Sequence, residues 1–156
     1  MAKSTEQVIE LVERAFDGVR LGDGIGLWQA QAIDDWWDCE QMIREGRERD
    51  EKMDWRKIDV ETLNQCSSSP CFLDAEGFRF LIPAYIIAEL RTGVDGEIVW
   101  LLSKRSDIIM EKFTALNRAQ RLAIREFLIH VMDEPDHQDY RDEIEIALET
   151  AWADDM

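Results

Sequence analysis

The stretch AIDDWWDCE, residues 32–40, concentrates acidic side chains around a pair of tryptophans. Its polar and aromatic members are Asp34, Asp35, Trp36, Trp37, Asp38 and Glu40. Clustered carboxylates are ligands that Mg²⁺ and Ca²⁺ prefer, and they also act as general acids and bases. Carboxylates beside an exposed indole can instead bind a partner's arginine or lysine by stacking and ion pairing. The stretch therefore admits a metal or catalytic cluster, a docking surface, or a helix with a solvated acidic face.

Helical spacing groups these side chains. If the stretch is one helix, Asp34 and Asp38 share a face, while Ile33 and Trp37 share a neighbouring face that packs inward. A helix that begins near Asp34 would offset part of the repulsion between the acids through its N-terminal dipole. The sequence offers no phosphate-binding loop or second acidic motif of known spacing, which disfavours metal and acid–base chemistry.

A second concentration of acid lies near the C-terminus. Residues 133–156 hold ten acidic residues and one basic residue, a balance of −9 within the formal net charge of −16. A helix expected near residues 138–153 places four acids opposite its apolar face: Asp139, Asp142, Glu145 and Glu149. Any amphipathic surface helix has a solvated polar face, so solubility alone explains this pattern. Lysines would make the same helix face equally soluble, because folding prefers neither sign of charge. The excess of acidic residues therefore also favours a docking surface for a basic partner.

The other chemistry-bearing motifs are weaker. The segment LGDGIGL follows a helix rather than a strand and has no Walker lysine, so we interpret it as a turn. Cys66 and Cys71 have a Cys-x₄-Cys spacing, but zinc needs two further ligands, and Cys39, His130 and His137 form no second close pair. We therefore expect free thiols and neither metal nor cofactor.

Two histidines and three arginines remain. His130 lies on an apolar helix, where we expect a hydrogen-bonded core histidine, and His137 in an acidic loop is at most a weak pH sensor. Helical arginines occur at residues 118, 121 and 125, and we expect them to pair with the acidic C-terminal helix. A small anion site is the alternative for these arginines.

Composition limits the class of protein. The chain has 156 residues, which fits one globular domain spanning residues 1–156. Its net charge of −16 repels phosphate backbones and anionic lipids, so we expect no direct nucleic-acid or membrane binding. The chain shows neither a membrane-spanning apolar run nor a secretory signal, and its three cysteines cannot all pair. These features predict a cytoplasmic protein.

The elements that must position these residues are mainly helices. Capping signals begin four of them, at Ser4, Asp59, Asp74 and Asn117. The most apolar segment, near residues 78–90, predicts a buried central helix that Pro83 kinks or divides, with a strand at 78–82 as the alternative. The segment IVWLL is a further short strand candidate, and the charged segment near 44–54 is interpreted as a solvated helix end or connector. The expected fold is thus mainly α, a single-domain helical protein with at most one short strand or hairpin.

Four segments resemble a family of small bacterial proteins that is known as a domain of unknown function. They are DGIGLWQAQAIDDWWD, DWRKIDVETL, FLDAEGFRFLIPAYIIAEL and LNRAQRLAIREFL. The resemblance extends from about residue 8 to 131, and DAEGFRFLIPAY is its most specific part. Members usually have one aromatic where Trp36 and Trp37 stand. The resemblance implies a bacterial cytoplasmic origin and places AIDD and AEGFRF in one structural unit, but it implies no activity, cofactor or catalytic residue.

We expect a non-enzymatic acidic protein that binds a basic protein partner, as immunity or inhibitor proteins do. The expected partner-binding residues are Asp34, Asp35, Trp36, Asp38, Asp139, Asp142, Glu145 and Glu149. One alternative is a metal-dependent hydrolase that uses the carboxylates of residues 34, 35 and 38. The other is a self-associating regulatory domain, in which the apolar segment 78–90 extends into a homodimer interface.

Overall fold

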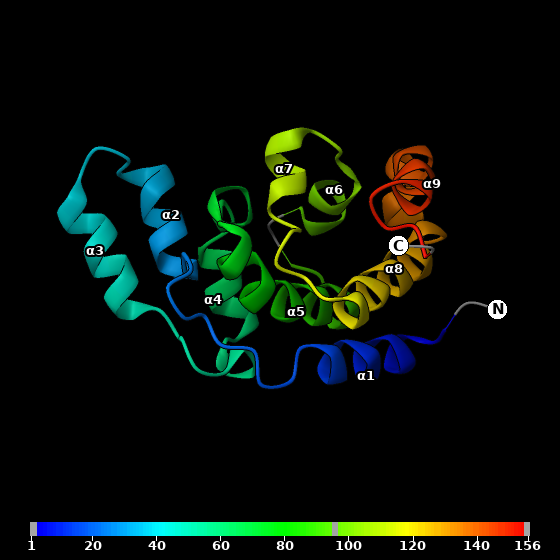
Figure 1. The fold of residues 1–156 in the computed structure, drawn as a ribbon, viewed down its shortest axis with the longest axis horizontal. Coiled ribbons are helices and arrows are strands. Elements are labelled where there is room, and N and C mark those ends of the chain that lie inside the picture. Colours follow the sequence, from blue (N-terminus) through cyan, green and yellow to red (C-terminus); the bar gives the residue numbers. More distant parts are fainter. Residues whose placement is uncertain (1–2, 95–96, 155–156) are drawn as a thin grey trace.

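The computed structural model describes residues 3–94 and 97–154, and these residues contain helices and no strand (Figure 1). The α-helices are α1 (Thr5–Ala15), α2 (Leu27–Asp35), α3 (Glu40–Arg49), α4 (Val60–Gln65), α5 (Ala75–Arg91), α6 (Ile98–Ser103), α7 (Asp107–Glu111), α8 (Arg118–Met132) and α9 (Arg141–Glu149). Three 3-10 helices join them: η1 (Trp55–Lys57), η2 (Ser69–Phe72) and η3 (Pro135–Tyr140). The predicted single-domain helical fold is confirmed.

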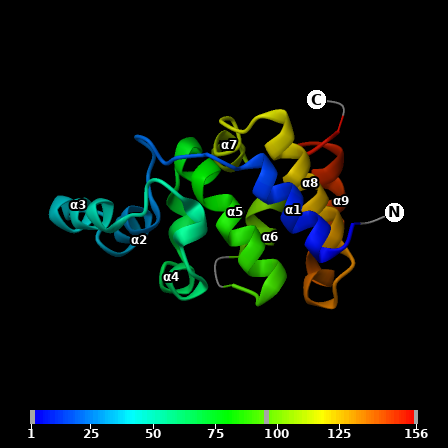
Figure 2. The same cartoon turned by 90° about the horizontal axis from the view of Figure 1, so that it is seen from below.

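The helix α5 lies at the centre because it is apolar nearly all round. Ten of its residues are buried, including Pro83, as expected for a helix without a solvated face. The helices α1 and α8 pack against one another, and α1 also packs on α5, as Figure 2 shows from below. The apolar segment 78–90, which the self-association alternative extends into a homodimer interface, is therefore largely covered by the chain itself.

Two sequence-based alternatives for this region were wrong. The helix α5 continues unbroken through Pro83, so the segment is neither two helices nor a strand at 78–82. Proline removes one backbone donor, but the burial of the surrounding side chains stabilises the helix on both sides of it. The strand candidate IVWLL forms α6 instead, where Ile98, Val99, Leu101 and Leu102 are buried in the common core.

The predicted helix starts are confirmed. Ser4 and Gln7 form a reciprocal capping box, as do Asn117 and Gln120. Asp59 accepts a hydrogen bond from the Thr62 N–H at 2.8 Å. Each of these contacts joins residues three positions apart, so the sequence alone specifies them.

The loop before α2 lies on the start of α5. The Asp74 carboxylate accepts hydrogen bonds from the N–H of Ile25 at 2.9 Å and of Gly77 at 2.8 Å, so it caps α5 and fixes the loop together. A Cβ atom at Gly77 would lie 2.0 Å from the Ile25 carbonyl oxygen, so only glycine allows this approach. The contact joins the segments that lead into AIDD and AEGFRF.

Candidate functional site

The helices α2 and α3 form a helical hairpin that stands at one end of the molecule (Figure 1). The helix α2 ends at Asp35, and Trp36 to Cys39 connect it to α3. We call residues 34–40 the hairpin tip. The stretch is not one helix, so Asp34 and Asp38 do not share a helical face. The first two acids lie at the C-terminal end of α2, where the helix dipole disfavours negative charge.

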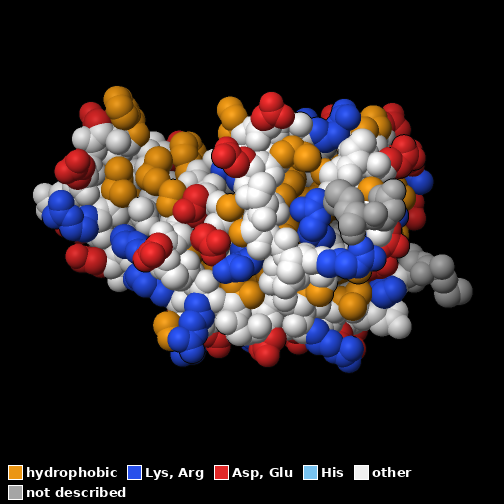
Figure 3. All heavy atoms as spheres, viewed as in Figure 1, with side chains coloured by type: hydrophobic (Ala, Val, Ile, Leu, Met, Phe, Trp, Pro, Cys, Tyr) orange, Lys and Arg blue, Asp and Glu red, His pale blue; other side chains and the backbone are white. Residues whose placement is uncertain are grey.

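Both tryptophans of the hairpin tip are exposed. The exposed fraction is 49% for Trp36 and 77% for Trp37. The alternative in which Trp37 packs inward beside Ile33 is wrong, because the chain leaves the helical path after Asp35 and turns Trp37 out to solvent. Figure 3 shows apolar side chains at the free end of the hairpin with acidic side chains beside them.

The carboxylates of the hairpin tip are exposed to solvent. Within the described part of the chain, Asp34, Asp35, Asp38 and Glu40 form no ion pair. Asp35 accepts a hydrogen bond from the Gln31 side chain at 3.2 Å, which leaves its charge uncompensated. The predicted residues of this stretch thus form a continuous acidic and aromatic surface.

The base of the hairpin is packed closely. A Cβ atom at Gly46 would lie 2.7 Å from the Trp28 carbonyl oxygen, so the two helix backbones meet there. The buried Asp50 carboxylate accepts hydrogen bonds from the N–H groups of Trp28 and Gln29 at the start of α2. Burial raises the pKa of Asp50, despite those hydrogen bonds. The guanidinium of Arg49 stacks on Trp28 at 3.6 Å.

The charged segment near 44–54 is therefore not a loose connection in its first part. Residues 44–49 belong to α3, and Arg47 donates to the carbonyl oxygens of Gly22 and Gly24. The LGDGIGL segment that supplies these carbonyls is a turn, as predicted. Two arginines of the charged segment thus hold the base of the hairpin together. Arg49 contacts Trp28 of α2, and Arg47 contacts the loop that precedes α2.

The acidic residues of the C-terminal region lie on a separate surface. Asp139, Asp142, Glu145 and Glu149 are exposed, on and beside α9, at the opposite end of the molecule from α3 (Figure 1). Neighbouring cations balance part of this charge: the ion pairs Arg141–Glu145 and Lys104–Glu143 span 3.3 and 3.1 Å. The structure does not bring the two predicted groups of acids together.

Arginines of α8 hold the end of α9 through its backbone. Arg125 donates to the carbonyl oxygens of Leu148 and Trp152, both at 2.8 Å, and Arg121 donates to that of Ala151. The predicted pairing with the C-terminal region thus occurs. Arg121 and Arg125 contact backbone carbonyls, whereas Arg118 forms an ion pair with the Asp154 carboxylate at 3.7 Å. His130 is hydrogen-bonded as expected, to the Lys3 carbonyl oxygen at 3.0 Å and the Thr5 hydroxyl at 3.1 Å.

The three cysteines are free, and the surroundings of Cys66 and Cys71 do not activate these two thiols. Burial raises the pKa of the Cys66 thiol to about 12, and burial also raises the pKa of Cys71. Thiols with raised pKa values are poor nucleophiles at neutral pH. In the described ranges 3–94 and 97–154, no three His, Cys, Asp or Glu residues are placed to hold a metal ion.

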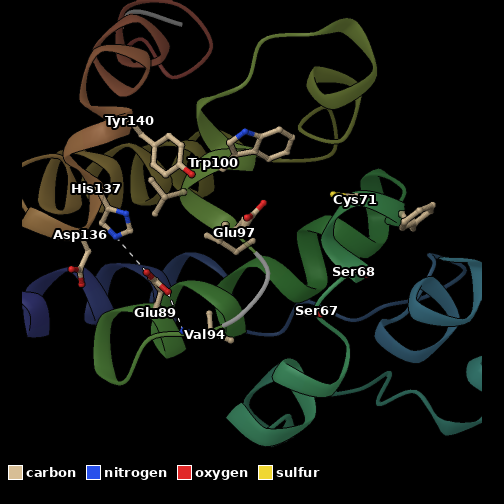
Figure 4. Close-up of a pocket in the computed structure, with 13 residues that line it drawn as sticks. Ser67, Ser68, Cys71, Glu89, Val94, Glu97, Trp100, Asp136, His137 and Tyr140 are labelled. Carbon is tan, nitrogen blue, oxygen red and sulfur yellow. Dashed lines mark hydrogen bonds and ion pairs between the residues drawn. The ribbon is translucent and has the colours of Figure 1, made fainter. Parts of the chain in front are cut away.

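A pocket that sequence reasoning missed lies where η2, the end of α5, α6 and η3 meet (Figure 4). Its volume is about 580 Å³, and its walls include Glu89, Glu97, Trp100, His137 and Tyr140. His137 is buried there, with its Nε2 atom 3.4 Å from the Glu89 carboxylate. No local sequence pattern predicts this pocket, because the residues that line it come from segments far apart in the sequence.

Comparison with known proteins gives a family and no activity. Nothing among curated proteins and nothing among solved structures matches the chain. None of the helices described is both long enough and apolar enough to cross a membrane. A family model matches residues 4–156, so the chain belongs to the family of unknown function DUF6714.

Proposed function

We propose that this protein binds a basic protein partner through the hairpin tip. The observation that carries the proposal is the pair of exposed indoles, Trp36 and Trp37, among carboxylates that form no ion pair with residues 3–94 or 97–154. Trp and Arg are enriched where binding energy concentrates in protein interfaces. An arginine of the partner can stack on an indole while its guanidinium pairs with a neighbouring carboxylate.

The energetics support a docking role for the tip. A tryptophan buries up to roughly 250 Å² in an interface, and about 25 cal/mol per Å² of apolar area gives several kcal/mol before the costs of association. In the free protein Trp37 is 77% exposed, so most of its apolar surface is still available to be buried against a partner. The net charge of −16 adds long-range attraction for a basic partner, which raises the association rate at low salt.

Inhibition of a basic enzyme, in the manner of an immunity or inhibitor protein, is the function that this surface fits best. An inhibitor needs a rigid, charged, partly aromatic surface, and the packed base of the hairpin supplies the rigidity. The proposal assigns no catalytic activity and no cofactor to the chain. It places the protein in the bacterial cytoplasm, where its free cysteines would stay reduced.

Capture from a bacterial lysate, with two matched pairs of variants, tests the proposal. The double variant Trp36→Ala/Trp37→Ala should lose a basic protein that the unaltered chain retains, whereas Ile108→Ala should keep it. Ile108 is the matched control because it is an apolar side chain with the same 77% exposure on another helix.

The second pair separates the position of charge from its amount. D34N/D35N/D38N and D139N/D142N/E149Q each remove three negative charges, one set from the hairpin tip and one from the C-terminal region. We expect only the first set to abolish capture at low salt, with mass spectrometry to identify the retained protein. Equal losses from both sets, or capture that survives the tryptophan variant, would exclude the hairpin tip as the docking surface.

A further inference from the structure

The pocket between η2, α5, α6 and η3 has the composition of a cation-binding site. Its volume of about 580 Å³ lies within the range of small-molecule sites. Carboxylates and aromatic rings share its walls: Glu89, Glu97, Asp136, Phe72, Trp100 and Tyr140. Among the described residues that line it, none is a lysine or an arginine. The lining of the pocket therefore combines negative charge with aromatic surface.

The carboxylates of this pocket differ in how they are engaged. Glu89 accepts a hydrogen bond from the Val94 N–H at 3.1 Å and lies 3.4 Å from His137, so its position is held (Figure 4). Glu97 and Asp136 form no ion pair with any residue in 3–94 or 97–154. Uncompensated carboxylates in a concave wall attract a cation and repel an anion.

The backbone of Glu97 has an unusual conformation. Its φ is 52° and its ψ is 44°, the left-handed conformation, and no other non-glycine residue described has a positive φ. The remaining positive φ angles belong to Gly18, Gly22 and Gly93, which lack the Cβ atom that makes this conformation costly. This conformation sets the direction in which the Glu97 side chain leaves the start of α6, at the wall of the pocket.

The aromatic rings determine which cation fits. Figure 4 shows Trp100 and Tyr140 at one rim, the His137–Glu89 pair at another, and the Glu97 side chain between them. The Lys104 ammonium group lies over one face of the Trp100 ring, 5.0 Å from its centroid, so a cation of the chain already engages that face. A guanidinium group is planar, stacks on aromatic rings and pairs with carboxylates through two parallel hydrogen bonds.

We propose that this pocket binds an alkylguanidinium group, with the Glu97 carboxylate as its ion-pair partner and the Trp100 and Tyr140 rings as its stacking surface. The ligand is a small organic cation or the arginine side chain of a peptide, and both present the same group. The proposal is separate from the hairpin tip: the pocket lies on different elements and involves none of the tip residues.

Nuclear magnetic resonance titration with ethylguanidinium tests this pocket. We expect saturable shifts of the Trp100 indole N–H and of the Glu97 amide, and no such shifts with ethylurea, its neutral isostere. Glu97→Gln should weaken binding about tenfold, the effect of losing one charge-assisted interaction of about 1.4 kcal/mol. Glu149→Gln, which removes an exposed carboxylate from α9, is the matched control and should bind as the unaltered chain does.

The outcomes separate the two ligand sources and the two proposals. Nα-acetylarginine amide that binds more tightly than ethylguanidinium assigns the pocket to a peptide arginine, and equal or weaker binding assigns it to a small cation. Equal shifts with ethylurea, or unchanged affinity in Glu97→Gln, would overturn the proposal, as would an absence of saturable shifts. Trp36→Ala/Trp37→Ala should keep guanidinium binding while it loses the basic protein, so failure of one proposal leaves the other intact.

Discussion

The two acidic ends of this molecule look alike in sequence and differ in structure. Each combines carboxylates with tryptophan, at the hairpin tip and around α9. At the tip, Trp37 is 77% exposed and its acidic neighbours have no ion pairs within the described residues. Near α9, Trp152 is buried, and the acids Glu143 and Glu145 pair with Lys104 and Arg141.

The difference lies in what each aromatic side chain contacts. The Trp152 indole donates a hydrogen bond to the Leu102 carbonyl oxygen at 2.8 Å, and its ring lies 4.6 Å from that of Phe113. Trp152 therefore stabilises the fold itself, because it joins the C-terminal segment to α6 and to the turn that follows α7. The tryptophans of the hairpin tip keep most of their apolar surface available, so acidic composition alone does not distinguish a docking surface from a structural one.

The largest expected effect comes from removing one tryptophan from each end. Trp152→Ala should lower the free energy of unfolding by about 3–5 kcal/mol, because it leaves a cavity and breaks a buried hydrogen bond. Trp37→Ala should change it by less than about 0.5 kcal/mol, the usual result for an exposed position. Urea denaturation of both variants measures the contrast, and a comparable loss in Trp37→Ala would show that the tip has a structural role.

A smaller effect is expected at the closest contact inside the hairpin. Gly46→Ala should destabilise the protein by about 1–3 kcal/mol, because the added methyl group meets the backbone of Trp28 and forces the helices apart. Faster amide exchange should be confined to residues 27–50, which hydrogen-exchange mass spectrometry resolves. Glu48→Ala, an exposed change on the same helix, is the control. Faster exchange throughout α5 and α8 would mean that the hairpin and the core unfold together.

The smallest effect is a pH dependence located at the base of the hairpin. Burial raises the pKa of Asp50 in the folded protein above its ordinary value of 3.8, so the folded state holds this proton more tightly than the unfolded chain does. The contribution of Asp50 is therefore most favourable below pH 3.8 and declines as the pH rises through the raised pKa. The unfolding free energy of the unaltered chain should fall relative to that of Asp50→Asn across this window.

Urea titrations of both proteins at successive pH values measure that difference. The asparagine cannot ionise, so it isolates Asp50 from the other carboxylates of the chain. A relative stability that rises with pH would contradict the assignment, because it would mean that the backbone hydrogen bonds from Trp28 and Gln29 outweigh the cost of burial.

The sequence by itself determined the local structure and the sign of the charge. The caps at Ser4, Asp59 and Asn117 follow from hydrogen bonds that span three residues, and the buried character of α5 follows from its apolar composition. The acidic face of α9 follows from helical spacing. These features depend on neighbours along the chain, so they can be read without knowledge of the fold.

Only the tertiary structure decided which acidic surface is free. The helix break after Asp35 turns Trp37 outward, and no residue type in AIDDWWDCE marks that break. The strand candidate IVWLL forms α6, because burial against distant helices decides the structure of a short apolar run. The pocket around Glu97 joins segments near residues 70, 89, 97 and 137, which are close only after folding. The exposure of Trp37 and the meeting of the pocket's lining segments both depend on long-range packing. Sequence spacing describes only neighbours along the chain, so it could not specify either feature.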